Sequence, residues 1–523
     1  MLTALAPALL LGLSIAPQDA PRTAPEASAH GRTTTLAEAQ QFLEALAGLP
    51  EGHRVAVGTA GTSGEGRPLL LAAVGGDQPT LDAEVARRRG GLRLLIVANI
   101  HGGEVEGKEA VLQLLRETAE GAHDARWADC QAWFLPIYNV DGNERIAQAN
   151  RVSQNGPDGG VGERANAAGL DLNRDFVKAE APETRALLQV VSAFDPHLVM
   201  DLHTTDGSYH GYHLTYATSL SPNTDPRLDR FARERILATT RSRVRATDGF
   251  RIFDYGNLTR GEPQRWATYD HRPRFGTNML GLRNRVAVLS EAYSYLPFAE
   301  RIAVTRAFVL GVVDSARAAA PELMALTARL DAELVEGRAT LFGDQTRLCE
   351  PRPWDLLVGE VEEVLLEGLG TRRVAGTVWR TQRVGLQDRF VAGRLRVLPA
   401  AWVIAAPTEE DRAALDRHGV RYEIATAERG ARMQRFVIAD VRRAERLFQG
   451  HHEVALGGSW EPGPDAVPEG SLVVPSWQRL GRMAAQLLEP ESEDSLFTWN
   501  HFDARLQVGA PAPVLRVERW TGD

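Results

Sequence analysis

The chain has 523 residues, of which 44% are hydrophobic and 24% are charged, and its formal net charge at pH 7 is -9. This length exceeds what one hydrophobic core usually supports, so the composition predicts a globular protein with two folded domains. The acidic balance gives no general attraction to nucleic acid, which excludes that class of partner.

The amino terminus carries an apolar stretch from Leu2 to Ala16, which is too short to span a bilayer comfortably and is followed by small residues and proline. It is typical of a secretory signal, which we expect over residues 1–20, and it predicts a secreted or periplasmic protein. A short lipoprotein-like or uncleaved anchor is the alternative. No later apolar run is long enough to cross a membrane, so we expect no membrane-spanning segment in the mature chain.

The fold is expected to begin near Thr35 with a helix over residues 36–50, where apolar side chains recur at helical spacing. Residues 54–76 then favour two strands joined by a short turn. The apolar run at 92–97 is suited to a buried strand, whereas residues 105–121 have helix-forming composition. The sequence therefore predicts strand, turn and helix in succession around residue 101.

That turn holds two residue types that bind metal ions. His101 and Glu104 are separated by two glycines, so both side chains can converge just beyond the carboxyl end of the strand, where open α/β sheets place their ligands. A catalytic zinc site needs three protein ligands and an open position for water. An HxxE pattern alone is weak, and a third ligand must come from elsewhere.

Two further buried strands end in residues of the same kind. Residues 197–207 form an apolar run that delivers His203, and residues 285–295 form another that delivers Glu291. Chance rarely brings three such strand ends together in one chain. A long polar, glycine-rich loop from 142 to 171 precedes the DLNRD motif, and loops of that length in compact domains are usually functional or disordered.

The carboxyl-terminal half has a different pattern of residues. Residues 302–341 favour one or two helices that close the first domain, and beyond them short apolar runs alternate with Gly and Pro turns. Helices are expected near 409–417 and 477–488, which indicates a smaller α+β domain. The two cysteines, Cys130 and Cys349, fit either one disulfide or two separate thiols, so a zinc site must rest on His and carboxylate ligands.

The ordered motifs HGGE, NVDG, DLNRD, DLHTT and LSEAY resemble those of the zinc carboxypeptidase family of metallopeptidases. They are specific as a set, and the resemblance implies an α/β fold with a mixed central sheet flanked by helices over residues 35–320. A helical connection over 321–349 and a second, smaller α+β domain of unknown function over 350–523 complete the expected organisation. Nothing recognisable extends the family beyond about Pro321.

The resemblance also implies roles for single residues. His101, Glu104 and His203 match the zinc ligands, for one Zn²⁺ per chain, and Glu291 matches the general base. Arg151, in the loop between NVDG and DLNRD, occupies the place of the arginine that polarises the scissile carbonyl.

The DLNRD motif supplies the expected contacts to the substrate. Asn173 and Arg174 match the pair that grips the terminal carboxylate of a peptide, and Asp171 is a candidate partner for a zinc-bound histidine. The family also uses a tyrosine, for which Tyr255 and Tyr269 both remain candidates.

This set is complete for amide hydrolysis without a covalent intermediate, because zinc-activated water needs only a carboxylate to take its proton. The resemblance therefore implies a metallocarboxypeptidase that releases carboxyl-terminal residues from peptides. A zinc deacylase or amidase that acts on N-acyl amino acids or cell-wall peptides stays open as an alternative. An inactive zinc- or peptide-binding module is the alternative of another class, and the sequence does not indicate the oligomeric state.

Overall fold

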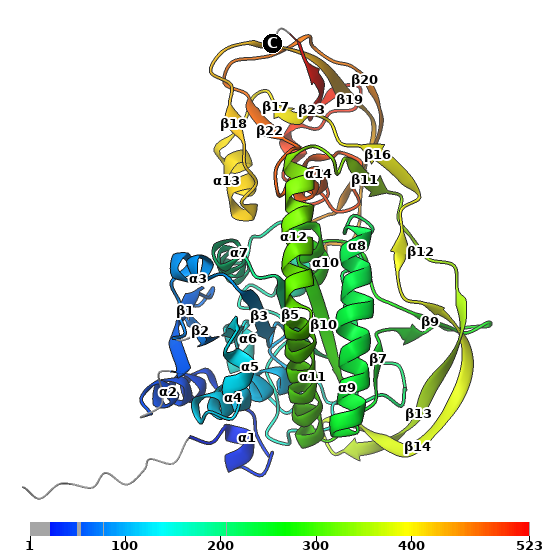
Figure 1. Cartoon of the computed structure of the whole chain (residues 1–523). Helices are drawn as coiled ribbons and strands as arrows, with labels where there is room; N and C mark the ends of the chain where they lie inside the picture. The colour runs from blue at the N-terminus through cyan, green and yellow to red at the C-terminus, as the bar shows by residue number, and fades with distance from the viewer. Residues whose placement is uncertain (1–20, 50–53, 77, 206, 522–523) are drawn as a thin grey trace, which may run out of the picture.

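A computed structural model describes residues 21–49, 54–76, 78–205 and 207–521 (Figure 1). The signal expected over residues 1–20 therefore lies outside the described residues. Within these ranges no helix is both long enough and apolar enough to cross a membrane.

The centre of the molecule is an eight-stranded sheet with the order β1-β2-β4-β3-β5-β10-β6-β7. Strands β4, β3, β5 and β10 run parallel to one another, whereas the β1–β2, β2–β4 and β6–β10 pairs are antiparallel. The predicted mixed sheet is thus confirmed. The strands are β1 Val55–Thr62, β2 Pro68–Gly75, β3 Leu92–Ala98, β4 Cys130–Leu135, β5 Leu198–Thr205, β6 Leu214–Thr218, β7 Ile252–Asp254 and β10 Val286–Tyr293.

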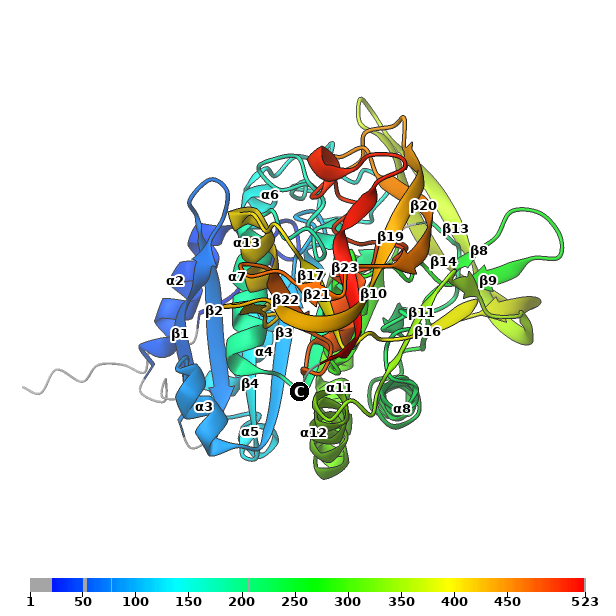
Figure 2. The same ribbon diagram turned by 90° about the horizontal axis from the view of Figure 1, so that it is seen from above.

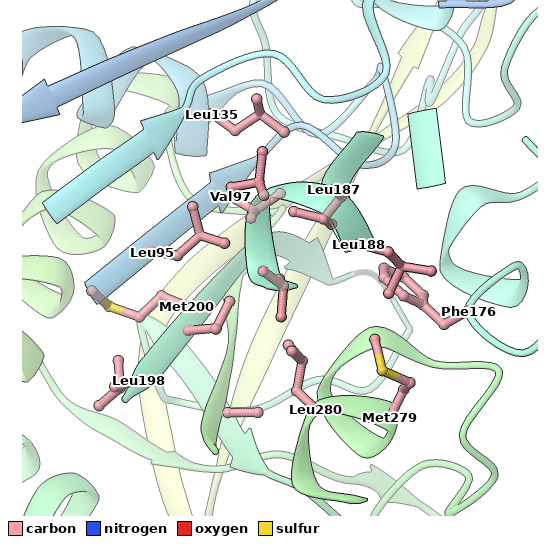
Figure 3. Packing of buried hydrophobic residues seen from close by; sticks show 14 of the residues in the cluster. Leu95, Val97, Leu135, Phe176, Leu187, Leu188, Leu198, Met200, Met279 and Leu280 are labelled. Atoms are coloured by element: carbon pink, nitrogen blue, oxygen red, sulfur yellow. The ribbon is translucent and has the colours of Figure 1, made fainter. Parts of the chain in front are cut away.

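Helices cover both faces of this sheet, which is why its central strands are apolar runs without alternation. On one face, α7 (Pro182–Phe194) and α10 (Gly276–Leu282) cover Leu95, Val97 and Val199, and Figure 3 shows Leu187 of α7 beside Val97. Because successive strand residues point to opposite faces, Leu94 and Ile96 face the other side, where α4 (Glu106–Ala119) packs against α11 (Phe298–Ala318). Full burial of such a side chain contributes about 1.5 to 3 kcal/mol.

The remaining helices of this half are short or peripheral. They are α1 Ala24–Ala27, α2 Leu36–Ala47, α3 Ala83–Arg89, α5 Asp124–Trp127, α6 Val140–Glu144, α8 Pro226–Phe231, α9 Ala238–Asp248 and α12 Ala320–Val335. Helix α2 begins where expected, because Thr35 and Glu38 form a capping box at its start.

A long hairpin links the two halves of the chain. Its strands β13 (Arg352–Leu366) and β14 (Gly370–Gln387) join a sheet with β9 (Arg265–Ala267) and β8 (Asn257–Leu258). Figure 2 shows these four strands together, on the side of the molecule away from β1.

The carboxyl-terminal region contains a seven-stranded sheet whose path is β18-β22-β17-β23-β19-β20, with β21 paired to β19. Helices α13 (Glu409–His418) and α14 (Gly481–Leu488) accompany it and confirm the helices expected near 409–417 and 477–488. The strands are β17 Ala401–Ile404, β18 Glu423–Ile424, β19 Arg429–Arg443, β20 Val454–Pro462, β21 Ala466–Val467, β22 Leu472–Pro475 and β23 Pro511–Trp520.

The connection between the halves differs from the expected one. Residues 321–349 are helical only as far as Val335, after which β11 (Leu341–Asp344) and β12 (Arg347–Leu348) pair with β16 (Arg394–Val397) and β15 (Phe390–Val391). One continuous cluster of buried side chains runs from Leu36 to Val514, so both halves contribute to a common core. The limits 35–320 and 350–523 stay predictions. Cys130 and Cys349 are both free thiols, so they do not pair.

Candidate active site

The turn after β3 is held by its own backbone and by close neighbours. The Asn99 side-chain amide donates to the carbonyl oxygens of His101, Gly102 and Glu104 at 3.0 to 3.2 Å. A Cβ atom on Gly102 would lie 2.4 Å from the Gly142 carbonyl carbon, so only glycine fits at that position. The turn therefore presents His101 and Glu104 in one fixed orientation.

Three buried side chains converge at this point. His101, Glu104 and His203 each offer one ligand atom, and these atoms lie within 4.8 Å of one another. The Nδ1 atoms of His101 and His203 lie 2.9 Å from Glu104 Oε1 and Oε2, respectively. The structure thus brings together all three residues that the sequence singled out as metal ligands.

The Nε2 atom of each histidine, on the ring edge away from Glu104, contacts another carboxylate. His101 Nε2 lies 3.0 Å from Asp171 Oδ1, and His203 Nε2 lies 2.9 Å from Asp201 Oδ2. Burial alone would raise the pKa of Asp171, but the charges of His101 and Arg164 hold it well below its usual range. Asp171 is therefore ionised, and a neutral His101 that donates its Nε2 proton to Asp171 would direct its Nδ1 lone pair toward Glu104.

This donor set fits a zinc ion. Without a metal ion, protonated imidazoles can donate hydrogen bonds to Glu104 across these 2.9 Å contacts, and a metal cation bound by the neutral imidazoles would replace those protons. Two neutral imidazoles and one carboxylate form a three-ligand set that Zn²⁺ prefers in catalytic sites. A zinc ion held by these three ligands would keep a further coordination position for water or substrate.

Glu291 lies next to His203 in the parallel register of β5 and β10. Its Oε2 atom is buried, and no hydrogen-bond partner for it exists among the described residues. Burial raises the pKa of Glu291 to about 8, the positive charge of His203 lowers it, and the Glu104 carboxylate raises it. No structural hydrogen bond ties this oxygen down, so it is free to exchange a proton.

The structure brings Arg151 to the site, where each of its three guanidinium nitrogens donates one hydrogen bond. Nη1 donates to Glu104 Oε1 at 3.1 Å, Nη2 donates to the Thr204 carbonyl at 3.0 Å, and Nε donates to Gln154 Oε1 at 3.0 Å. Its side chain is 15% exposed.

A second arginine, Arg164, was not singled out by sequence reasoning. Its side chain is 47% exposed, it donates to Asp171 Oδ2 from Nε and Nη2, and Nη1 lies 3.4 Å from His101 Nδ1. The signal that could have found it is its place in the same polar loop, seven residues before Asp171.

Asn173 and Arg174 lie on η2 (Leu172–Arg174), whose first turn is capped by the Asp171 side chain. Asn173 Oδ1 accepts a hydrogen bond from the Gly276 backbone at 3.0 Å, and Nδ2 lies 3.4 Å from His203 Nε2. The Arg174 guanidinium lies 4.0 Å from the Phe275 ring, and Nη1 donates to the Asn173 carbonyl. In the described ranges, Nε and Nη2 of Arg174 make no hydrogen bond, so the fork is available to a ligand.

The carboxyl-terminal half also reaches this segment. The Asp171 backbone N–H donates to Gln449 Oε1 at 2.7 Å, across 278 residues of sequence. No local pattern in the sequence could have indicated this contact.

The two candidate tyrosines pack on each other, with ring centroids 5.5 Å apart. The Tyr269 hydroxyl forms a 2.7 Å hydrogen bond with Thr277 Oγ1. Burial raises the pKa of Tyr269, and the Asp201 and Glu291 charges raise it further, so its hydroxyl stays protonated.

Curated proteins are similar to part of the chain. A mouse carboxypeptidase D is 35% identical over 152 residues, which cover 24% of this chain and 11% of the mouse protein. Carboxypeptidase 2 of Trichophyton tonsurans is 27% identical over 117 residues, which cover 21% of this chain and 18% of that protein. The chain therefore spans only a small part of the length of these curated relatives.

Among solved structures, a metallo-carboxypeptidase from Burkholderia cenocepacia is 18% identical with a TM-score of 0.41, over 55% of this chain and 70% of that one. A metallo-carboxypeptidase from Pseudomonas aeruginosa is 20% identical with a TM-score of 0.39, over 56% and 70% of the two chains. The zinc carboxypeptidase model matches residues 40–305, slightly more than half of the chain. That range contains the central sheet from β1 to β10 and all the predicted site residues, so the chain belongs to the zinc carboxypeptidase family.

Proposed function

We propose that the protein is a zinc-dependent carboxypeptidase that releases residues from the free carboxyl end of peptides. One Zn²⁺ per chain is held by His101, Glu104 and His203. The observation that carries the proposal is a three-ligand cluster with two neighbouring groups, the untethered carboxylate of Glu291 and the open guanidinium of Arg174. The apolar amino-terminal stretch supports a location outside the cytoplasm.

Bound zinc would polarise the scissile carbonyl and lower the pKa of water toward neutrality. Glu291 takes the proton of the attacking water at its carboxylate and later gives that proton to the leaving amine. Burial raises the pKa of the Glu291 carboxyl group, whereas a nearby Zn²⁺ would lower it, so the ionised carboxylate can accept the water's proton and hold it until the amine leaves.

Arginines act on the two charged parts of the substrate. Arg174 binds the terminal carboxylate through its planar fork, and Asn173 lies beside it. Arg151 and Arg164 are the candidates for stabilising the oxyanion that develops on the carbonyl. Arg164 is more exposed and has a guanidinium edge near His101 Nδ1, so the geometry favours it.

The alternatives differ in what they require of the substrate. A deacylase that cleaves N-acyl amino acids needs the same binding of the substrate carboxylate, but its substrate has no peptide chain. An amidase that acts on cell-wall peptides needs a different leaving group. An inactive binding module has no need for a free carboxylate such as Glu291 beside its metal ligands.

The test compares two peptides of one sequence, one with a free carboxyl terminus and one with a carboxyl-terminal amide. The purified zinc-loaded protein should shorten the free peptide by single residues and cut the amide far more slowly, as followed by mass spectrometry. Equal cleavage of both, cleavage at internal bonds, or turnover of N-acyl amino acids alone would refute the carboxypeptidase assignment.

A further inference from the structure

A cavity of about 450 Å³ lies where the carboxyl-terminal half packs against the central-sheet half. The end of α7 and the segment before β10 form one side of it, and residues after α13 and before α14 form the other. Figure 1 shows α7 and α13 as neighbours at this place. Four arginines line the cavity: Arg283, Arg285, Arg421 and Arg479.

Two of these arginines are neutralised by carboxylates. Arg285 lies 2.6 Å from Asp195 and 2.9 Å from Asp331, and Arg479 lies 3.0 Å and 2.8 Å from the same two groups. Asp195 has a third arginine, Arg93, at 3.6 Å. Three arginines therefore share two carboxylates, which leaves this group of side chains with a net positive charge.

Among the described residues, the other two arginines form no ion pair. Arg283 is only 7% exposed and donates to neutral acceptors, the His418 carbonyl at 2.9 Å and Ser192 Oγ at 3.0 Å. In the portion of the chain that the structure covers, no carboxylate lies within ion-pair distance of Arg283, and the Arg421 side chain has neither a hydrogen bond nor an ion pair.

A buried cation without an anionic partner is costly. Burial lowers the pKa of Arg283 to about 10, the charge of Arg285 lowers it too, and Asp195 partly offsets this. An anion in the cavity would relieve this cost, because it would meet Arg283 and Arg421 from opposite sides.

We propose that this cavity binds a small dianion, a phosphate group or a dicarboxylate. Planar guanidinium groups bind both chemistries through paired N–H donors, and the Ser192 hydroxyl adds a neutral donor. The cavity has the size of ordinary small-molecule sites, which are roughly 300 to 1,000 Å³. Arg283 comes from the central-sheet half and Arg421 from the other, so the bound anion stabilises the contact between them.

The site is separate from the proposed peptidase centre. Arg283 precedes β10, whereas Glu291 lies near the other end of that strand. Anion binding can therefore be measured whether or not the protein cleaves peptides.

The test is calorimetric titration of the full chain with inorganic phosphate and, separately, with succinate, at constant ionic strength. One or both should bind saturably at one site per chain and raise the melting temperature with concentration. Arg421→Gln should weaken that binding by about 10-fold or more, because a charged hydrogen bond is lost. Arg283→Met should abolish it.

Arg417→Gln is the matched control, because it removes the same charge four residues away and Arg417 does not line the cavity. Binding of phosphate alone identifies a phosphate-bearing ligand, and binding of succinate alone identifies a dicarboxylate. Arg421 is exposed and unpaired, so its variant should fold even if Arg283→Met does not. The proposal is overturned if wild type shows no saturable binding, or if Arg421→Gln binds as tightly as Arg417→Gln.

Discussion

Two arginines lie within reach of the proposed metal ligands, but their surroundings give them different tasks. Arg151 is tied to Glu104, Thr204 and Gln154, so it holds a ligand in place. Arg164 is anchored to Asp171 through one edge and is nearly half exposed, so it can meet a substrate carbonyl.

This difference predicts distinct outcomes for matched substitutions. Arg164→Gln should lower kcat by about 10²- to 10³-fold, the usual effect of removing an oxyanion donor, with zinc content unchanged. Arg151→Gln should lower zinc retention as well as activity, because Glu104 loses its charged partner. Steady-state kinetics with metal analysis distinguishes the two variants. If Arg151→Gln lowered only kcat and Arg164→Gln lowered zinc retention, Arg151 would be the residue that stabilises the oxyanion.

At the level of single residues, the sequence predicted those site residues that lie at the ends of strands. His101, Glu104, His203 and Glu291 follow apolar runs, and parallel strands bring such ends to one edge of the sheet. Arg164 was missed because one loop holds both arginines and spacing alone does not say which one turns inward. Gln449 was missed because its contact depends on tertiary packing.

At the scale of elements, a tight turn from Phe448 to His451 is the feature that reaches the site. Two backbone hydrogen bonds of 2.8 and 3.0 Å close it, and Gln449 and Gly450 have φ of 51° and 82°. Positive φ is uncommon for a residue such as glutamine. This conformation directs the Gln449 amide to the Asp171 backbone, at the start of the segment that carries Asn173 and Arg174.

Gln449→Ala should therefore weaken the binding of the peptide's terminal carboxylate by Asn173 and Arg174, although Gln449 itself does not contact the substrate. We expect KM for free peptides to rise about 3- to 10-fold, the usual effect of one neutral hydrogen bond, and the preference for free over amidated peptides to fall. His451→Ala is the control, because His451 lies in the same turn and contacts Glu180 instead. If both variants only lower the melting temperature and leave the preference unchanged, Gln449 is a structural contact.

The secondary structure itself was largely predictable, because long apolar runs and helical periodicity are strong local signals. Strands β3, β5 and β10 and helices α2, α13 and α14 lie where the sequence indicated. The short strands β8 and β9 could not be foreseen, since β9 pairs with β14, more than a hundred residues away, and β8 pairs with β9. The strands β11 and β12 likewise depend on distant partners, which explains why the connection was expected to be helical throughout.

At the scale of the whole molecule, the two halves are joined through charged groups as well as through a common core. Asp494 is fully buried, lies 2.9 Å from Arg274, and accepts a hydrogen bond from Trp499 Nε1. Arg274 belongs to the central-sheet half, so this pair couples the two halves.

Asp494→Ala should lower the free energy of unfolding by about 3 to 5 kcal/mol, because it leaves Arg274 buried beside one partly exposed carboxylate, Glu453. Urea unfolding should remain a single transition, and its midpoint should shift to a lower urea concentration. Glu409→Gln, which breaks an exposed pair with Arg412, should cost less than about 1 kcal/mol. Two separate transitions, with only one shifted by Asp494→Ala, would show that the halves unfold independently.

The most direct measurement is the turnover of Glu291→Gln, made together with its zinc content. Glutamine keeps the size of the side chain but cannot take a proton from water, so kcat should fall by about 10²- to 10⁴-fold. Zinc should stay near one equivalent, whereas His203→Ala should lose metal and activity together. Near-normal turnover of Glu291→Gln would remove this residue from the mechanism, and loss of zinc along with activity would make it a ligand instead of the base.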